Sequence, residues 1–291
     1  MAPFLDPSQL SQISLKDIRR SRQPLDTIPI PSSVDMLTTQ SYRLIPATTP
    51  LDRCELVDAL KNKFRGSSFF GNDIPFHPLL RGNLQHAERG VVVRRDMLTS
   101  LRAVNKTLEP YGYELFLHDG YRTAACQADI RRRVEMYWHD KGESFLSEEG
   151  LKEFCENNAD KVASRATAEP DQCDPTTWFA HSTGASLNVT LVHRSGAPAE
   201  MGGMFLDLTG AQETNYYEVH TPRHLREEMA RTNRRLLFWS MALHGWYNYP
   251  HLYAQYDYCA EKATQFGIQS ALAWNFADIT IPTCASIGPA C

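Results

Sequence analysis

The chain lacks the long apolar runs that membrane proteins need, since none approaches the roughly 18 to 20 residues of a bilayer-spanning helix. Residues 1–32 also lack the basic-then-apolar order of a secretory signal. No Cys-x-x-Cys pair is present, which argues against a zinc ribbon and against a thioredoxin-like redox motif. From these absences we expect a cytoplasmic protein without a membrane partner.

The sequence also has little net charge. Thirty Lys and Arg oppose 34 Asp and Glu, for a net charge of -4, and no long block carries a single sign. A broad basic surface of the kind that binds nucleic acid is therefore not expected. The sequence has neither a glycine-rich phosphate loop nor an internal repeat, which argues against a P-loop nucleotide site and a solenoid.

The chain has enough apolar residues for a substantial core, with 291 residues of which 42% are hydrophobic and 10% aromatic. Its seven cysteines are odd in number and widely scattered, so we expect most of them to be thiols. If a structural disulfide forms, Cys284 and Cys291 are the candidate pair because they lie close together in the sequence.

The first part of the chain differs in composition from the rest. Residues 1–55 are rich in Ser, Pro, Gln and Thr and show weak periodicity, which predicts an irregular N-terminal extension without catalytic residues. We assign residues 56–291 to a single folded domain.

Within this domain, helical and strand patterns mix without regular βαβ alternation. Apolar residues at helical spacing predict a helix over 97–108, and Pro110 and Gly112 end it. The apolar and aromatic run 113–118 predicts a core strand, as does the alternating run 185–192. Further helices are predicted near 123–139, 148–163 and 223–244, and further strands near 246–249 and 253–258. The fold class is therefore α+β, with a central, mostly antiparallel sheet flanked by helices.

Three ordered segments carry the most specific signal in the sequence: His118-Asp-Gly-Tyr-Arg122, His181-Ser-Thr-Gly-Ala-Ser-Leu-Asn188, and the run from Asn248 to Tyr258. Met201-Gly-Gly203 and the run from Asn233 to Leu237 support them. Together the segments resemble the D-alanyl-D-alanine dipeptidases, which belong to a zinc peptidase group that also includes lysostaphin-like enzymes and hedgehog domains. The resemblance covers roughly residues 60–275 and implies a dipeptidase-like fold.

The resemblance also implies roles for individual positions. Arg122 matches the arginine that stabilises the oxyanion of the tetrahedral intermediate, and His181 matches the first zinc ligand. The second ligand of the family, an aspartate, is replaced by Asn188, and the third, a histidine, by Gln255. Leu252 stands where the family has its general base, a glutamate.

These replacements predict a change of chemistry. Amide oxygens bring no charge and little basicity, so His181 with Asn188 and Gln255 forms a degenerate site that would hold zinc weakly. General-base catalysis contributes roughly 10²- to 10⁴-fold, and an aliphatic side chain cannot supply it. We therefore expect no resident cofactor, with weak zinc binding left open, and no ordinary dipeptide hydrolysis.

Other residues are candidates for substrate binding. Asp207 lies near the acidic position that binds the substrate amine in the family, but it is offset by one residue. His251 and Tyr253 are accessory candidates, beside Asn188 and Gln255 as hydrogen-bonding groups. Purely structural roles stay open at this point: Arg122 could be an ion-pair partner of Asp119, His181 a core histidine, and the C-terminal tyrosines part of the core packing.

The leading hypothesis is a non-hydrolytic or metal-independent enzyme that acts on a small amino-acid or dipeptide-like molecule. Its catalytic residues would be Arg122, which anchors a carboxylate or oxyanion, and His181, which moves protons. A lyase, isomerase, cyclase or amide-forming reaction fits, and specialised metabolism is a natural setting. The alternatives are a catalytically dead homologue that binds a peptide, small molecule or protein, and a residual zinc dipeptidase. The sequence predicts no oligomeric state.

Overall fold

The structure is a computed structural model that describes residues 15–21, 23–31, 45–46, 56–72, 77, 84, 86–143, 146–160, 181, 184–206, 208, 210–249, 251–258 and 272–273. The candidate residue Asp207 and the candidate pair Cys284 and Cys291 lie outside the described residues. Within them, Cys126 and Cys155 are thiols that form no disulfide.

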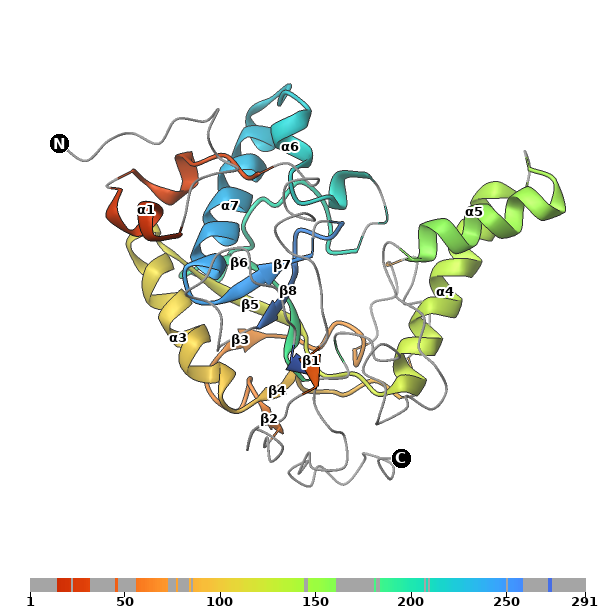
Figure 1. The fold of residues 1–291 in the computed structure, drawn as a ribbon, viewed down its shortest axis with the longest axis horizontal. Coiled ribbons are helices and arrows are strands. Elements are labelled where there is room, and N and C mark those ends of the chain that lie inside the picture. The colour runs from red at the N-terminus through yellow and green to blue at the C-terminus, as the bar shows by residue number, and fades with distance from the viewer. Residues whose placement is uncertain are drawn as a thin grey trace.

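A five-stranded sheet forms the centre of the fold (Figure 1), in the order β3-β5-β6-β8-β7. Its strands are β3 (Arg65–Gly66), β5 (Tyr113–Asp119), β6 (Ser186–His193), β8 (Gln255–Tyr258) and β7 (Trp246–Asn248). Only the edge strand β3 is parallel to its neighbour, and the other three pairings are antiparallel. This confirms the predicted α+β class with a mostly antiparallel central sheet.

Two long helices pack against the sheet and against each other: α3 (Met97–Leu108) and α7 (Leu225–Ala242). Helices α4 (Ala124–Gly142) and α5 (Glu148–Asp160) pack together and project from the opposite side of the molecule in Figure 1. A short helix, α6 (Tyr216–Val219), precedes α7. None of the described helices combines the length and the apolarity that crossing a membrane requires.

The short elements were not predictable from periodicity, because a pattern needs several residues to show. They are the 3-10 turns η4 (Glu109–Tyr111) and η7 (Gly210–Gln212), and two two-stranded sheets. One sheet joins β2 (Leu56–Asp58) to β4 (Val92–Arg94), and the other joins β1 (Ile45–Pro46) to β9 (Leu272–Ala273).

Part of the N-terminal segment packs on the long helix α7. It contains a helix, α1 (Leu15–Arg20), and a 3-10 turn, η2 (Leu25–Thr27), and the side chain of Ile28 that follows is fully buried. The indole nitrogen of the buried Trp239 donates a hydrogen bond of 2.9 Å to the carbonyl of Ile28. The predicted boundary at residue 55 stays a prediction.

One buried arginine of α7 organises the loop that follows β6. Arg234 is 2% exposed and donates from three different nitrogens to the carbonyl oxygens of Met201, Ala211 and Glu213, at 2.7 to 2.9 Å. Its guanidinium also lies 4.1 Å from the ring centroid of Tyr253. The loop from Met201 to Glu213 therefore depends on this side chain for its backbone hydrogen bonds.

We predict that Arg234→Ala lowers the free energy of unfolding by about 3–5 kcal/mol, because three backbone carbonyl groups lose the donors of a buried guanidinium and the ring of Tyr253 loses its cation. Arg231→Ala is the matched control on the same helix, since Arg231 pairs with the partly exposed Glu228. A surface pair of that kind contributes at most about 1 kcal/mol. Urea unfolding of both variants measures the difference, and equal losses would contradict the assignment.

Candidate functional site

Two glycines allow the first two motif segments to lie against β2 and β4. A Cβ on Gly120, just after β5, would lie 2.1 Å from the carbonyl oxygen of Val92, so only glycine fits there. Gly184 has a φ of +65°, and a Cβ on it would lie 2.6 Å from a side-chain methyl of Leu56. Gly120 is required on steric grounds, and Gly184 on conformational grounds as well.

Backbone hydrogen bonds then join the two segments around His181. The carbonyl of His181 accepts from the backbone N–H groups of Arg122 at 3.2 Å and of Gly184 at 3.3 Å. The ring atom Nδ1 of His181 donates to the carbonyl of Gly120 at 2.7 Å. Because a carbonyl can only accept, Nδ1 carries the hydrogen and Nε2 presents a lone pair.

Arg122 directly precedes Thr123, whose hydroxyl caps α4. The guanidinium donates from Nε to Asp119 Oδ2 at 2.6 Å and from Nη1 to Gln127 Oε1 at 2.8 Å. It also lies 4.6 Å from the ring centroid of Phe70. Arg122 is 5% exposed, and Nη2 is the guanidinium nitrogen without a hydrogen bond to the described residues.

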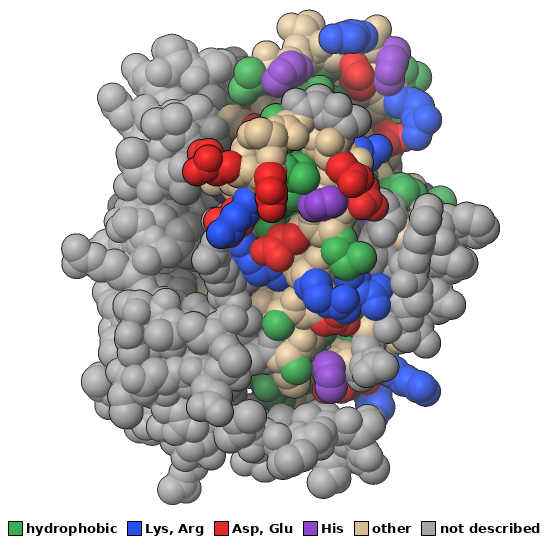
Figure 2. Space-filling view, turned by 90° about the vertical axis from the view of Figure 1, so that its right-hand side faces the viewer, with side chains coloured by type: hydrophobic (Ala, Val, Ile, Leu, Met, Phe, Trp, Pro, Cys, Tyr) green, Lys and Arg blue, Asp and Glu red, His purple; other side chains and the backbone are tan. Residues whose placement is uncertain are grey.

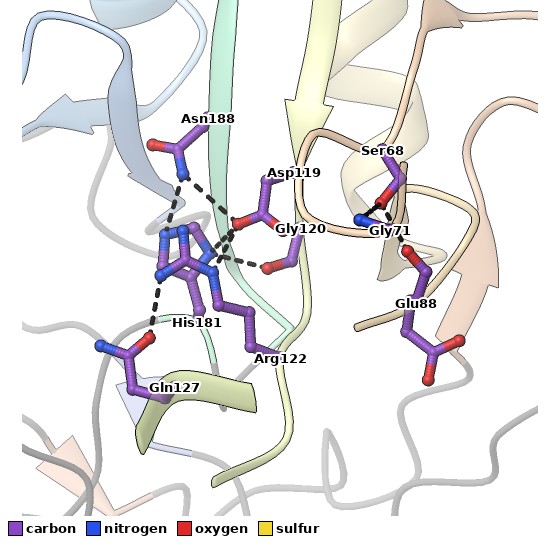
Figure 3. A network of polar contacts seen from close by, with 9 residues as sticks. All are labelled: Ser68, Gly71, Glu88, Asp119, Gly120, Arg122, Gln127, His181 and Asn188. Carbon is purple, nitrogen blue, oxygen red and sulfur yellow. Dashed lines mark hydrogen bonds and ion pairs between the residues drawn. The ribbon is translucent and has the colours of Figure 1, made fainter. Parts of the chain in front are cut away.

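Asn188 lies on β6, is fully buried, and joins Asp119 and His181. Its Nδ2 lies 3.3 Å from Asp119 Oδ2 and 3.4 Å from His181 Nε2. An ionised carboxylate accepts only, so the amide turns its nitrogen toward Asp119. Figure 3 shows the amide oxygen pointing away from both partners, and this buried Oδ1 has no hydrogen-bond partner among the described residues. We call Asp119, Arg122, Gln127, His181 and Asn188 the Arg122 network.

The electrostatics of the network follow from its burial. Burial raises the pKa of Asp119, although the ion pair with Arg122 and the hydrogen bond from Asn188 oppose this. Burial, and next the charge of Arg122, lower the pKa of His181 well below its usual value. His181 is therefore a neutral imidazole at neutral pH, with Nδ1 3.3 Å from Asp119 Oδ2.

The third motif segment contributes β8, which pairs with β6. Gln255 lies directly opposite Asn188 in the strand register and is half-buried. Leu252, which the resemblance aligns with the family's general base, is 3% exposed and belongs to the hydrophobic core. Tyr253 packs against Arg234, and the ring of His251 lies 5.4 Å from that of Tyr249. The structure thus brings Arg122, His181 and Asn188 into hydrogen-bonded contact, and the roles of the other candidates stay predictions.

Sequence reasoning missed two residues beside these. Ser186 lies two positions before Asn188, and Asp257 two positions after Gln255, and the two face each other across β6 and β8. Both are at most 5% exposed, and burial raises the pKa of Asp257 to about 6, although Ser186 partly opposes this. The alternation of polar and apolar residues along β6 could have indicated Ser186 and Asp257. Polar side chains on a buried strand face need hydrogen-bond partners, and such partners come from the neighbouring strand.

The ligand positions implied by the resemblance are His181, Asn188 and Gln255, of which His181 and Asn188 are in side-chain contact. Within the described ranges, no three His, Cys, Asp or Glu side chains are grouped so that they could hold a metal ion. The carboxylate of Asp119 lies 3.3 Å from Nδ1 of His181 and is engaged with Arg122.

A separate hollow of about 870 Å³ lies between α4 and α5, and its lining includes Met136 and Cys155. It shares no residue with the Arg122 network. Figure 2 views this side of the molecule, where basic and acidic side chains are interspersed on the described surface. Such a mixture is typical of a solvated face, so the hydrogen-bonded network is the stronger candidate site.

No family model matches the chain. A D-alanyl-D-alanine dipeptidase of Synechocystis sp. is 30% identical to it over 188 residues, which are 60% of this chain and 72% of that protein. The similarity therefore extends well beyond a single motif.

Proposed function

The chain belongs to the D-alanyl-D-alanine dipeptidase family, and on this premise we propose that it is a metal-independent enzyme with a non-hydrolytic reaction. Its substrate in this proposal is a small amino-acid or dipeptide-like molecule. The observation that carries the proposal is the amide nitrogen of Asn188, which lies 3.4 Å from Nε2 of His181.

The residues present do not fit a resident zinc ion. In the family, the lone pair of this histidine would be directed at the metal, but here it faces an N–H group with a partial positive charge. Turning the amide by 180° would direct its oxygen toward His181, but also toward the carboxylate of Asp119, which it would repel. The hydrogen bond to Asp119 therefore supports an orientation that opposes a cation at this place.

Loss of the general base supports the same proposal. A residue that activates water contributes roughly 10²- to 10⁴-fold to a hydrolytic rate, and the buried Leu252 cannot do so. A lyase, isomerase, cyclase or amide-forming reaction does not need an activated water. These reaction classes therefore suit the residues better than peptide hydrolysis.

The chemistry that remains is anion binding and proton transfer. Arg122 offers Nη2 to a substrate carboxylate or a developing oxyanion, in a buried setting where such a bond is strong. His181 would accept a substrate proton at Nε2 after the substrate has displaced the amide N–H of Asn188, which lies 3.4 Å from it. Asp119, 3.3 Å from Nδ1, would then stabilise the imidazolium that forms.

A second candidate function is ligand binding without turnover. The observation in its favour is the strongly lowered pKa of His181, which makes the imidazole a weak base. In this case Arg122 would still bind a carboxylate, and the network would serve recognition alone.

We test the proposal by screening amino acids and dipeptides for turnover in the presence of a chelator. We expect conversion by the wild type, a loss of about 10²- to 10⁴-fold in kcat for His181→Ala, and mainly a raised KM for Arg122→Lys. Binding without turnover would favour the second candidate. Turnover that requires added zinc would contradict the proposal.

A further inference from the structure

A second hollow, of about 460 Å³, lies between the turn that joins β2 to β3 and helix α3, which is on the left of Figure 1. Its volume falls within the roughly 300 to 1,000 Å³ that is typical of small-molecule sites. The described lining consists of three cationic side chains, two amides and one aromatic ring: Lys61, Lys63, Arg102, Asn62, Asn105 and Phe64. It contains no Asp or Glu and shares no residue with the Arg122 network. This composition indicates an anionic ligand.

The positive charge of the hollow is not neutralised by neighbouring side chains. Lys61, Lys63 and Arg102 form no ion pair with a described carboxylate. The next cation along the chain differs in this respect, because Arg65 pairs with Glu114 at 2.6 Å. The three cations of the hollow are therefore available to a ligand.

An aromatic ring positions the guanidinium of Arg102. The carbon Cζ of Arg102 lies 5.7 Å from the ring centroid of Phe64, which is 7% exposed. Contact with the ring face is favourable for a cation and restricts the long side chain. A guanidinium held in this way offers its planar fork of donors, which matches two oxygens of a phosphate group.

Asn105 adds uncharged donors beside Arg102. The two residues are three positions apart on α3, so their side chains lie on the same face of the helix. Oδ1 of Asn105 accepts from the backbone N–H of Leu115 at 2.8 Å. Because that N–H can only donate, the amide oxygen is the engaged end. The NH₂ group of Asn105, with two donors, is the end that remains for an anion.

Lys63 has an unusual backbone conformation for a lysine. Its φ is +69°, in the left-handed region that favours glycine. The turn requires this conformation, since the N–H of Lys63 donates to the carbonyl of Leu60 and the N–H of Phe64 to that of Ala59. Glycine would meet the same requirement without strain. Residues held in such regions cluster at ligand sites, so a lysine here supports a binding role.

We propose that this hollow binds the diphosphate group of a small molecule. A single phosphate ester carries about −1.5 to −2 charge at neutral pH, so three cations suit two linked phosphate groups better than one. The oxygens of a diphosphate accept hydrogen bonds, and the guanidinium, ammonium and amide groups supply the donors. A nucleic acid fits less well, because it binds to an extended basic stripe rather than to one hollow.

Titration calorimetry of the full chain with inorganic pyrophosphate, in metal-free buffer, tests the inference. Inorganic phosphate is titrated in parallel, and pyrophosphate is expected to bind about 10-fold more tightly. Arg102→Ala is expected to weaken pyrophosphate binding by about 10-fold or more, because charge-assisted hydrogen bonds are lost. Lys106→Ala is the matched control, since Lys106 is an exposed cation of α3 outside the lining. Its affinity should stay within about 2-fold of the wild type.

Lys63→Gly separates a binding role from a structural one. This variant relaxes the turn, so it should unfold at the same temperature as the wild type or higher, while its affinity for pyrophosphate falls. Unchanged affinity in Lys63→Gly would overturn the role of the lysine in binding.

Two further results would overturn the diphosphate site. One is a wild type that does not bind pyrophosphate, or binds it no more tightly than phosphate. The other is an equal loss of affinity in Lys106→Ala and Arg102→Ala, which would show attraction by the general charge of α3. Neither result bears on the proposed function, because the Arg122 network is unchanged in every variant.

Discussion

Replacing Arg122 with alanine is expected to lower the free energy of unfolding by about 3–5 kcal/mol at neutral pH, because it leaves a buried carboxylate without its partner. The Arg122 and Asp119 side chains are 6% and 8% exposed and joined at 2.6 Å. The same variant loses the hydrogen bond to Gln127 and the contact with the ring of Phe70. The affinity for substrate is expected to fall in the same variant.

The loss in Arg122→Ala is expected to grow as pH rises. The pKa of Asp119 in the folded protein is already raised by burial, and removal of the guanidinium raises it further. A carboxyl whose pKa is higher in the folded than in the unfolded state destabilises the fold as pH rises above the unfolded value of about 3.9. The variant should therefore lie closer to the wild type at pH 5 than at pH 8.

The matched variant is Asp119→Asn combined with Arg122→Ala, which removes both charges. It should recover part of the stability and should lose the added pH dependence, because no buried carboxylate remains at residue 119. Urea unfolding at pH 5 and pH 8 measures all three proteins. A pH-independent loss in the single variant would show that Asp119 is not held by Arg122.

The second large effect is expected from restoring the acidic and histidine positions of the family. Asn188→Asp with Gln255→His is expected to gain zinc affinity by at least about 10³-fold, because two strong donors join His181. Residues 188 and 255 are direct partners across β6 and β8, so both new side chains lie on the same face. Without metal, the new carboxylate at 188 would face Asp119 and repel it, since the amide nitrogen now there lies 3.3 Å from Asp119 Oδ2.

Thermal unfolding with and without zinc measures this effect. The double variant is expected to unfold at a lower temperature than the wild type in chelator, and to gain about 4 kcal/mol when zinc exceeds Kd by 1,000-fold. Asn188→Asp alone and Gln255→His alone are the controls and should gain less. An equal gain in the thermal stability of the wild type on adding zinc would contradict the interpretation that its site does not suit the metal.

Much of the architecture was predictable because its elements are long and periodic. The helices α3 and α7 and the strands β5 and β6 lie where the apolar patterns placed them. The short strand β3 carries too few residues for a pattern, and its parallel pairing with β5 is visible only in three dimensions. The packing of Ile28 against Trp239 likewise joins residues 211 positions apart.

The candidate site was predictable in part. The motif segments indicated that Arg122, His181 and Asn188 would lie together, and the structure places them in one network. From the sequence, Asp119 is expected only as a structural partner of Arg122, whereas its carboxylate also contacts His181 and Asn188. The pairing of Ser186 with Asp257 depends on strand register, which no local pattern specifies.

Zinc content and turnover of the purified wild-type protein test the central claim most directly. The protein is expected to hold far less than one zinc per chain, and not to cleave D-alanyl-D-alanine with or without a chelator. One tightly held zinc per chain, together with cleavage that chelation abolishes, would contradict the account.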